Sequence, residues 1–395
     1  MAHRNEAFAS GDRKLYNIFR NKVNRLRQML RKQYFDRKIN DLKRSNNRKW
    51  WKEIKSLCGI SNAETTSQFE SVCFRGSAVV KAELPSVINR FLCEIAADVS
   101  PLNYDVILNL RNEFALNHCD YNVSEFEVYN VLTRLKDGKA CLDDSINNKL
   151  LRTLADVFAA PICALINTSF RQGLVPDQWK LSRITPVPKA IPIRNVENDI
   201  RPIAVTCPIS RVAESFVAQF FDDHFEERLD ENQFGSTKGR STTLALIKIS
   251  HVLFLASDDS SNIIRVLFVD FRKAFELIDH SILSKKFNDY DFPPTLSAWM
   301  LSFLSNRKQF VKIGDSVSDI CLTNAGAPQG TRAGPNDFKV LINDLDFETP
   351  YVKYVDDLSV VTISTDPQIN EMQYVANNIL EWSTSFLINQ RLKRC

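Results

Sequence analysis

The sequence predicts an α+β fold in which helices alternate with a small, largely antiparallel sheet. Three observations support this prediction: apolar residues recur at helical spacing in several segments, a β-branched run precedes Asp270, and two short apolar runs flank a pair of aspartates. The chain has 395 residues and 44% of them are hydrophobic, so it can bury a sizeable core and form two or three subdomains.

The N-terminal segment is strongly basic. Residues 1–60 hold 17 Lys and Arg against 5 Asp and Glu, a net charge of +12, whereas the whole chain carries +4 and the remainder therefore −8 (4 − 12). Apolar residues recur among these cations at roughly helical spacing: Ile18, Val23, Leu26, Leu30, Tyr34 and Ile39. We predict one or two basic amphipathic helices over residues 1–57. They either bind nucleic-acid phosphates or form a solvated face packed on the next domain, and Trp50 and Trp51 are predicted to pack rather than to stack on bases.

Residues 58–123 are predicted to be a connecting region of unknown role, with breaks at Leu84-Pro85 and Ser100-Pro101. Helical patterning resumes over residues 124–171, where Ser124 and Glu127 match a capping box. Further helices are predicted over residues 214–228, 241–256 and 293–304, and strands near residues 309–313 and 318–323.

Two segments place carboxylates at strand ends. Residues 263–269 are β-branched and apolar, which predicts a buried strand that ends at Asp270. The run Tyr354-Val355-Asp356-Asp357 lies between two apolar runs and predicts a tight hairpin with both aspartates at its tip. Adjacent carboxylates repel each other unless a cation lies between them, and three of them suit two divalent ions. A solvated Asp-Asp turn and a merely exposed Asp270 are the alternatives.

A loop with a Pro-Gln-Gly sequence lies between these two segments. Gln329 offers an amide that can bond a ligand, and Gly330 allows the backbone to approach one, although a purely structural loop is the alternative. A helix is predicted to follow over residues 336–345, with Pro335 at its first position and an apolar stripe of Phe338, Leu341, Ile342 and Leu345.

In this order the motifs resemble those of the reverse transcriptases of non-LTR (LINE-type) retrotransposons. The matching pieces are residues 173–176, 179–180, 185–189, 199–203, 232–235, 268–275, 327–331, 342–345 and 354–357. The resemblance runs from about Ser124 to about Trp382. It implies a right-hand polymerase with fingers over residues 124–262 and a palm over residues 263–395. That palm is expected to be incomplete, the thumb absent, and no endonuclease present ahead of the basic segment.

The resemblance also implies roles for single residues. Asp270, Asp356 and Asp357 would form a catalytic triad holding two Mg²⁺ ions, with Mn²⁺ as a substitute. Phe275 would be the aromatic gate that excludes a ribose 2′-hydroxyl, and Gln329 and Gly330 would line the nucleotide pocket. Lys189 and Arg201 would clamp the triphosphate, with a solvated surface charge as the alternative for both. The expected partners are an RNA template, a DNA primer and dNTPs, with an endonuclease or thumb supplied by another chain.

Several positions depart from the family pattern. Glu276 stands where aspartate is usual, and Arg332-Ala333 and Asn336-Asp337 replace residues that are usually apolar. The stretch from Lys139 to Asp144 lacks the usual glycine. Glu381-Trp382-Ser383 begins a further palm motif, which Asn389, Lys393 and Cys395 match imperfectly. Because the thumb that would grip the duplex is expected to be absent, we do not expect processive synthesis by this chain alone.

The remaining composition restricts compartment and class. None of the nine cysteines forms a CxxC pair and the five histidines show no metal-ligand spacing, which predicts reduced thiols in an intracellular setting, nuclear or cytoplasmic. No signal peptide or membrane-spanning run is found. Two alternatives to a reverse transcriptase are a catalytically silent nucleic-acid-binding remnant and a related polymerase, such as an intron maturase or viral RNA polymerase. Phe275 and the Pro-Gln-Gly loop favour deoxynucleotides.

Overall fold

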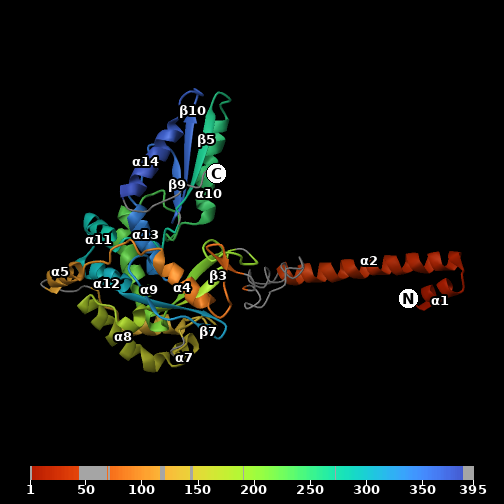
Figure 1. The fold of residues 1–395 in the computed structure, drawn as a ribbon. Coiled ribbons are helices and arrows are strands. Elements are labelled where there is room, and N and C mark those ends of the chain that lie inside the picture. Colours follow the sequence, from red (N-terminus) through yellow and green to blue (C-terminus); the bar gives the residue numbers. More distant parts are fainter. Residues whose placement is uncertain are drawn as a thin grey trace. The chain divides into compact units, whose positions relative to one another are not determined.

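The computed structural model describes residues 2–43, 69, 72–115, 121–142, 146–189, 191–271 and 273–385. The chain divides into two compact units, Met1–Ser67 and Gln68–Cys395 (Figure 1). The predictions made for Trp50 and Trp51, and for Asn389, Lys393 and Cys395, lie outside the described residues.

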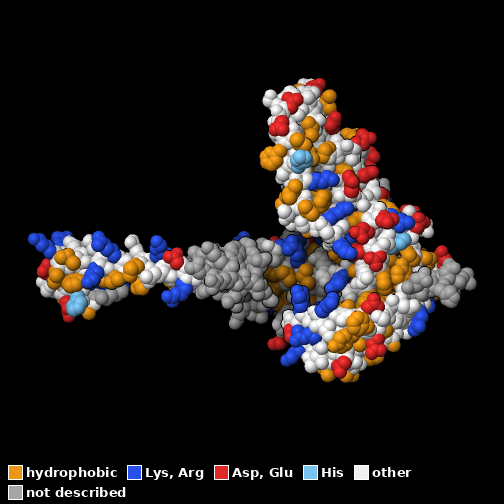
Figure 2. Space-filling model, turned by 180° about the vertical axis from the view of Figure 1, so that it is seen from behind, with side chains coloured by type: hydrophobic (Ala, Val, Ile, Leu, Met, Phe, Trp, Pro, Cys, Tyr) orange, Lys and Arg blue, Asp and Glu red, His pale blue; other side chains and the backbone are white. Residues whose placement is uncertain are grey.

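The described part of the first unit contains two helices, α1 (Ala2–Ala9) and α2 (Arg13–Lys43), which agrees with the helical character predicted for residues 1–57. Asp12 caps α2 by accepting the N–H groups of Lys14 and Leu15, both at 3.0 Å. α1 packs on the first half of α2 through ring contacts such as Phe8 with Tyr16. Beyond α1, apolar side chains of α2 stay exposed among its cations (Figure 2).

The second unit is built mainly of helices. Their bounds are α4 (Leu84–Glu94), α5 (Tyr104–Ala115), α6 (Glu125–Thr133), α7 (Asn148–Thr153), α8 (Ala155–Gln172), α9 (Pro208–Phe225), α10 (Thr242–Ser257), α11 (His280–Asp289), α12 (Pro294–Leu304), α13 (Ala333–Ile342) and α14 (Glu371–Ser385). Their apolar faces form one large core, in which Phe221, Phe225, Trp299 and Phe303 are almost fully buried. Among the helices that the structure describes, none has the length and apolar character needed to cross a membrane.

Several predicted helix boundaries are confirmed and others are wrong. Ser124 and Glu127 form the predicted capping box at the start of α6. Leu84-Pro85 begins α4 instead of breaking the chain, because proline is tolerated in the first helical turn. α9 begins at Pro208, six residues before the predicted start, and α13 begins at Ala333, so Pro335 is its third residue.

One sheet has five strands: β3 (Leu181–Pro188), β4 (Ile200–Val205), β6 (Arg307–Ile313), β7 (Ser316–Val317) and β8 (Cys321–Thr323). The order is β4-β3-β6-β7, with β8 also paired to β6, and β3 and β6 run parallel while the other pairs are antiparallel. α4 packs on β6 and β8 and completes a second, smaller core. A two-residue hairpin, β1 (Cys73–Phe74) with β2 (Ser77–Ala78), lies ahead of α4.

The other sheet has the order β5-β10-β9 and is antiparallel throughout. Its strands are β5 (Ile263–Asp270), β9 (Tyr351–Tyr354) and β10 (Asp357–Ser364). β5 was predicted to be buried, and this is wrong: Val269 is its one buried residue, and Phe268 is 56% exposed. The reason is that β5 lies at the edge of this sheet and pairs there with β10 alone.

Candidate active site

Strand register brings two of the predicted aspartates together. Asp270 is the last residue of β5 and lies directly opposite Asp357, the first residue of β10. Asp357 also pairs with Tyr354, which leaves Val355 and Asp356 as a two-residue turn between β9 and β10. Directly opposed residues of antiparallel strands project from the same face, so the side chains of Asp270 and Asp357 share one face at the end of the sheet. Both are exposed, and Asp356 is half-buried beside them.

The carboxylates influence one another electrostatically. Burial raises the pKa of Asp356 to about 6, and the charges of Asp357, Asp270 and Glu276 contribute to this rise. Burial and the charge of Asp270 also raise the pKa of Asp357. Ionising the group therefore costs free energy, which a nearby cation would offset.

The donor set suits a hard divalent cation such as Mg²⁺, because it consists of carboxylate oxygens at a partly exposed edge. Among the described residues, no three His, Cys, Asp or Glu side chains converge closely enough to hold a metal ion in this arrangement. The backbone therefore places the three carboxylates at one edge of the sheet, but their oxygens do not converge on one metal position.

The turn that carries Asp356 is strained. Val355 has a φ of 59°, a conformation that β-branched residues rarely adopt and that glycine usually takes at the first position of a two-residue hairpin loop. Gln233, which is 1% exposed, holds this turn from the side. Its Oε1 accepts the Val355 N–H at 2.8 Å, and its Nε2 donates to the Val355 carbonyl at 3.4 Å. A Cβ on Gly235 would lie 2.4 Å from the Val355 nitrogen, so glycine is required there.

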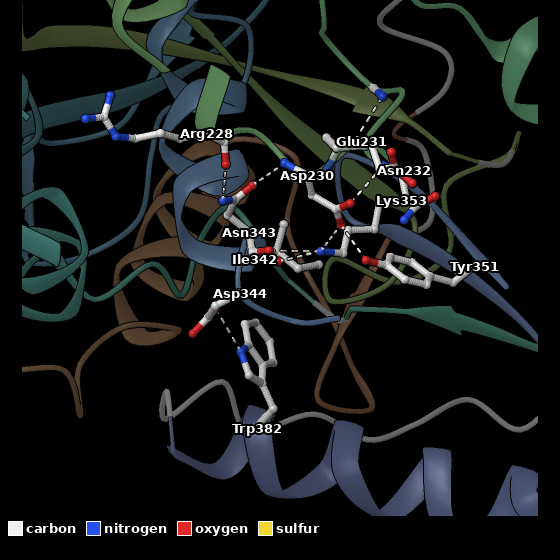
Figure 3. A network of polar contacts seen from close by, with 12 residues as sticks. Arg228, Asp230, Glu231, Asn232, Ile342, Asn343, Asp344, Tyr351, Lys353 and Trp382 are labelled. Carbon is white, nitrogen blue, oxygen red and sulfur yellow. Dashed lines mark hydrogen bonds and ion pairs between the residues drawn. The ribbon is translucent and has the colours of Figure 1, made fainter. Parts of the chain in front are cut away.

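A buried ion pair fixes β9 to the same segment (Figure 3). Lys353 is 0% exposed, and its Nζ lies 2.6 Å from Asp230 and donates to the Ile342 carbonyl at 2.9 Å. Tyr351 donates its hydroxyl to the same Asp230 carboxylate at 3.1 Å. Burial lowers the pKa of Lys353, and the charge of Asp230 opposes this change. Asp230 therefore favours the charged form of the Lys353 ammonium. The network ties β9 to the end of α13 and to the residues around Gln233.

The resemblance assigned no role to Gln233, Asp230 or Lys353 individually. The motif at residues 232–235 indicated a place in the family pattern, but its contact with Val355 joins residues 122 positions apart in the chain. Gly235, two residues after Gln233 in that motif, is the one local signal that a close backbone approach is needed.

The Pro-Gln-Gly loop is bonded on two sides. The Gln329 side chain donates to Glu276 at 2.8 Å, and the Ala327 N–H donates to the Phe275 carbonyl at 2.7 Å. On the other side, the Ala204 N–H of β4 donates to the Gln329 carbonyl at 2.7 Å. The loop therefore links the residues that follow Asp270 to the five-stranded sheet.

The remaining predicted site residues surround this loop. Phe275 is half-buried and stacks on Phe338, with ring centroids 5.8 Å apart. A Cβ on Gly330 would lie 3.3 Å from the Ala204 carbonyl, so Gly330 packs closely on β4. Lys189 is exposed at the end of β3, near enough for its charge to act on Glu276. Arg201 is exposed opposite Val187 in β4, and no contact joins it to the aspartates among the described residues.

A cavity of about 70 Å³ lies behind the loop. Gln329 and Glu276 line it at one end, and Cys93 lines it together with residues of β3, β6 and β8. Gly330 and the three aspartates are not among its lining residues. The three carboxylates therefore do not line this cavity.

Comparison with known proteins identifies the family. A model described as reverse transcriptase (RNA-dependent DNA polymerase) matches residues 187–390, which is 204 of the 395 residues and includes all three aspartates. The chain belongs to the reverse transcriptase family.

Curated relatives of this chain come from mobile elements of flies. It is 27% identical to the Drosophila melanogaster protein named probable RNA-directed DNA polymerase from transposon BS, over 53% of this chain and 23% of that protein. It is 23% identical to the RNA-directed DNA polymerase from mobile element jockey of the same species, over 68% of this chain and 31% of that protein. The chain thus spans about a quarter to a third of the length of these relatives.

Apart from the aspartates at the sheet edge, the chain has a pair of acidic side chains in its core. Asp337 of α13 is 0% exposed, and neither of its carboxylate oxygens has a hydrogen-bond partner within the described part of the chain. Burial raises its pKa well above the usual value, and the neighbouring Glu214 adds to the rise. Glu214 is buried too, but it accepts the Arg332 N–H at 3.0 Å and the Ser210 hydroxyl at 3.2 Å.

Proposed function

We propose that this chain is the polymerase portion of an RNA-directed DNA polymerase from a LINE-type retrotransposon. The reaction is the templated addition of a deoxynucleotide to a primer 3′-end, with release of pyrophosphate. The observation that carries this proposal is the register that sets Asp270 opposite Asp357, beside the turn holding Asp356, within the segment that matches the family. The printed names of the relatives support RNA as template and DNA as product.

Asp270, Asp356 and Asp357 are proposed to hold the catalytic cations. Two Mg²⁺ ions, or Mn²⁺ in their place, would acidify the primer 3′-hydroxyl and neutralise the triphosphate. The mutual repulsion of these carboxylates supports the assignment, since a cation removes the cost of ionising Asp356. The clamp from Gln233 would hold the turn so that Asp356 and Asp357 keep their position during each addition.

Residues around the Pro-Gln-Gly loop are proposed to bind the incoming nucleotide. Gln329 is oriented by Glu276, and Gly330 lets the loop lie close to β4. Phe275 is proposed to exclude the ribose 2′-hydroxyl, and its stacking on Phe338 would keep the ring fixed. Lys189 and Arg201 would contact the triphosphate from the β3–β4 hairpin. Replacing Phe275 by alanine should then admit ribonucleotides, and unchanged sugar selectivity would contradict the gate.

The domain plan follows from the same proposal. Residues 124–262 would be fingers and residues 263–395 palm, in a right-hand arrangement, with residues 58–123 as a connection. An intracellular setting is also proposed. In the second unit, Lys and Arg side chains gather around a hollow of the surface, which supports nucleic-acid binding there (Figure 2).

The basic N-terminal helices are proposed to bind template or primer phosphates. Cations such as Arg20, Lys22 and Arg27 are exposed along α2, and no acidic residue occurs in its first turn. Binding of this kind should weaken steeply as salt increases. Replacing these three residues by glutamine should reduce the salt dependence of RNA binding, whereas an unchanged salt slope would place the phosphate contacts elsewhere.

Primer extension tests the central proposal. The full chain is incubated with an RNA template, a DNA primer, Mg²⁺ and dNTPs, next to the Asp356→Ala, Asp357→Ala double variant and an Asp315→Ala control from the exposed turn between β6 and β7. Extension by the wild type and the control, but not by the double variant, supports a polymerase site. RNA binding without extension by any of the three would favour a catalytically silent nucleic-acid-binding protein.

A further inference from the structure

Two cysteine side chains meet where α4 packs on the five-stranded sheet. Cys93 lies near the end of α4, and Cys321 is the first residue of β8. Cys321 lies directly opposite Gln309 of β6, so both side chains project from the same face of the sheet. Gln309 donates from its Nε2 to the Cys93 sulfur at 3.6 Å and to the Asn89 side-chain oxygen at 3.1 Å, one turn earlier in α4. Gln309 therefore bonds Cys93 across the interface between α4 and the sheet, and it lies next to Cys321 on the neighbouring strand.

The two thiols are close enough to influence each other electrostatically, and both side chains are partly exposed. Burial and the neighbouring Cys321 raise the pKa of Cys93 to about 12, although the bond from Gln309 works in the opposite direction. Cys93 therefore keeps its proton at neutral pH and can donate it to the Cys321 sulfur. Small reagents have a route to the pair, because Cys93 lines the 70 Å³ cavity and neither side chain is fully buried.

We propose that Cys93 and Cys321 form a redox-responsive thiol pair that closes reversibly into a disulfide between α4 and β8 when the protein meets a peroxide. The geometry that supports this is the position of Gln309, which bonds the Cys93 sulfur and lies directly opposite Cys321 in the sheet. Nothing in the proposal depends on polymerase activity, so it stands or fails separately from the proposed function.

The oxidation removes two electrons, which hydrogen peroxide accepts. The Cys321 sulfur attacks one peroxide oxygen, the O–O bond breaks, and a sulfenic acid forms as the first water leaves. The Cys93 sulfur then attacks the Cys321 sulfur, the S–O bond breaks, and the second water leaves with the Cys93 proton. Two thiols and one peroxide thus give one disulfide and two waters. The first attack is assigned to Cys321 because Cys93 retains its proton and is the poorer nucleophile.

Closure should change the stability of the second unit. The bond would join residues 228 positions apart (321 − 93), and a disulfide that closes a long loop stabilises mainly by restricting the unfolded chain. The oxidised protein should therefore unfold several degrees above the reduced protein, and a dithiol reductant should remove the difference.

Peptide mapping tests the proposal on the full chain. The reduced protein is treated with increasing hydrogen peroxide, quenched with catalase, alkylated after denaturation, digested without reductant and analysed by mass spectrometry. We expect a linked peptide pair containing Cys93 and Cys321 that disappears with dithiothreitol, and a matching rise in Tm. Cys163→Ser is the matched control, because the Cys163 sulfur bonds the Val123 carbonyl at 3.3 Å, and it should behave as wild type.

Single variants separate the two steps. Cys93→Ser should give no linked pair and no rise in Tm, and its Cys321 sulfenic acid should accumulate and react with dimedone. Cys321→Ser should give neither product. The proposal is overturned if peroxide oxidises other cysteines while Cys93 and Cys321 both remain alkylated, or if either one links to a different cysteine. Should a variant fail to fold, the wild-type linked peptide alone decides.

Discussion

The second unit contains two groups of acidic side chains in contrasting surroundings. Asp270, Asp356 and Asp357 lie at one end of the three-stranded sheet, where strand register brings them together and solvent reaches them. Glu214 and Asp337 lie in the core, where both side chains are almost completely buried. Burial raises carboxyl pKa values in both groups.

The difference shows that a perturbed pKa is not by itself evidence of a catalytic group. The pKa of Asp337 is raised well above its usual value, yet its side chain is 0% exposed and its oxygens lack partners among the described residues. The edge group also has raised pKa values, but it combines exposure, strand register and a turn that Gln233 holds in place. Solvent exposure and a turn held by Gln233 therefore distinguish the candidate site from the buried pair of Glu214 and Asp337.

The largest expected effect separates the two groups by activity. Asp270→Asn should abolish primer extension, because the amide cannot supply the anionic oxygen that a divalent cation requires. Asp337→Asn should retain extension within a small factor, since Asp337 lies away from solvent and from the sheet edge. Both variants are compared with wild type in the same RNA-templated assay. Retained extension in Asp270→Asn, or its loss in a folded Asp337→Asn, would reverse the assignment of the two groups.

Removing the support of the turn should have the next largest effect. Gln233→Leu deletes the bonds to both polar groups of Val355, so the turn should relax and kcat should fall roughly 100-fold, as small misplacements can cause. KM for the dNTP should change little, because Gln233 does not line the proposed nucleotide pocket. Hydrogen exchange over residues 351–358 should also accelerate, a readout that needs no activity. Gln373→Leu, on the exposed face of α14, is the control.

Local patterns were sufficient to predict the strand ending at Asp270, the hairpin around Asp356 and the capping box at Ser124, because each depends on residues close in sequence. The clamp from Gln233 was not predictable, since it joins segments 122 positions apart. The burial of β5 was wrong for a related reason: an apolar run gives strand type but not whether the strand lies at a sheet edge. Asp337 was recognised as a departure from an apolar position, and its full burial became visible only in the packed core.

The core pair should be more important for stability than for activity. Asp337→Leu removes a buried carboxyl without partners among the described residues and should stabilise the protein by about 1–3 kcal/mol at pH 7. Because the folded-state pKa of Asp337 is raised, the folded state binds the proton more tightly. Wild-type stability therefore falls as pH rises from about 4 towards that raised value. The gain in the free energy of unfolding from Asp337→Leu should therefore be smaller at pH 5 than at pH 7, as measured by urea unfolding. Asp337→Asn is the size-matched control. A gain that does not grow with pH would show that the added leucine packing, and not the lost charge, is responsible.

The smallest expected effect concerns the stability of the edge group. Burial and neighbouring charges raise the pKa of Asp356 to about 6, so it is ionised and repelled at pH 7. Asp356→Asn should raise Tm by at most about 2 °C, since the side chain is half-buried and solvent screens the repulsion. The gain should shrink as pH falls below about 6 and vanish near pH 4, where Asp356 is protonated in the unfolded chain as well.

Adding Mg²⁺ should then reverse the order of the Tm values, so that wild type melts above Asp356→Asn. A ligand that binds the folded state raises Tm, so wild type should gain more from Mg²⁺ than Asp356→Asn does. Equal Mg²⁺ shifts in a thermal melt would mean that Asp356 is not a ligand and that the edge group resembles the core pair. If the order reverses, Asp356 destabilises the protein when Mg²⁺ is absent and binds Mg²⁺ when it is present. Asp337→Leu, in contrast, should gain stability whether or not Mg²⁺ is present.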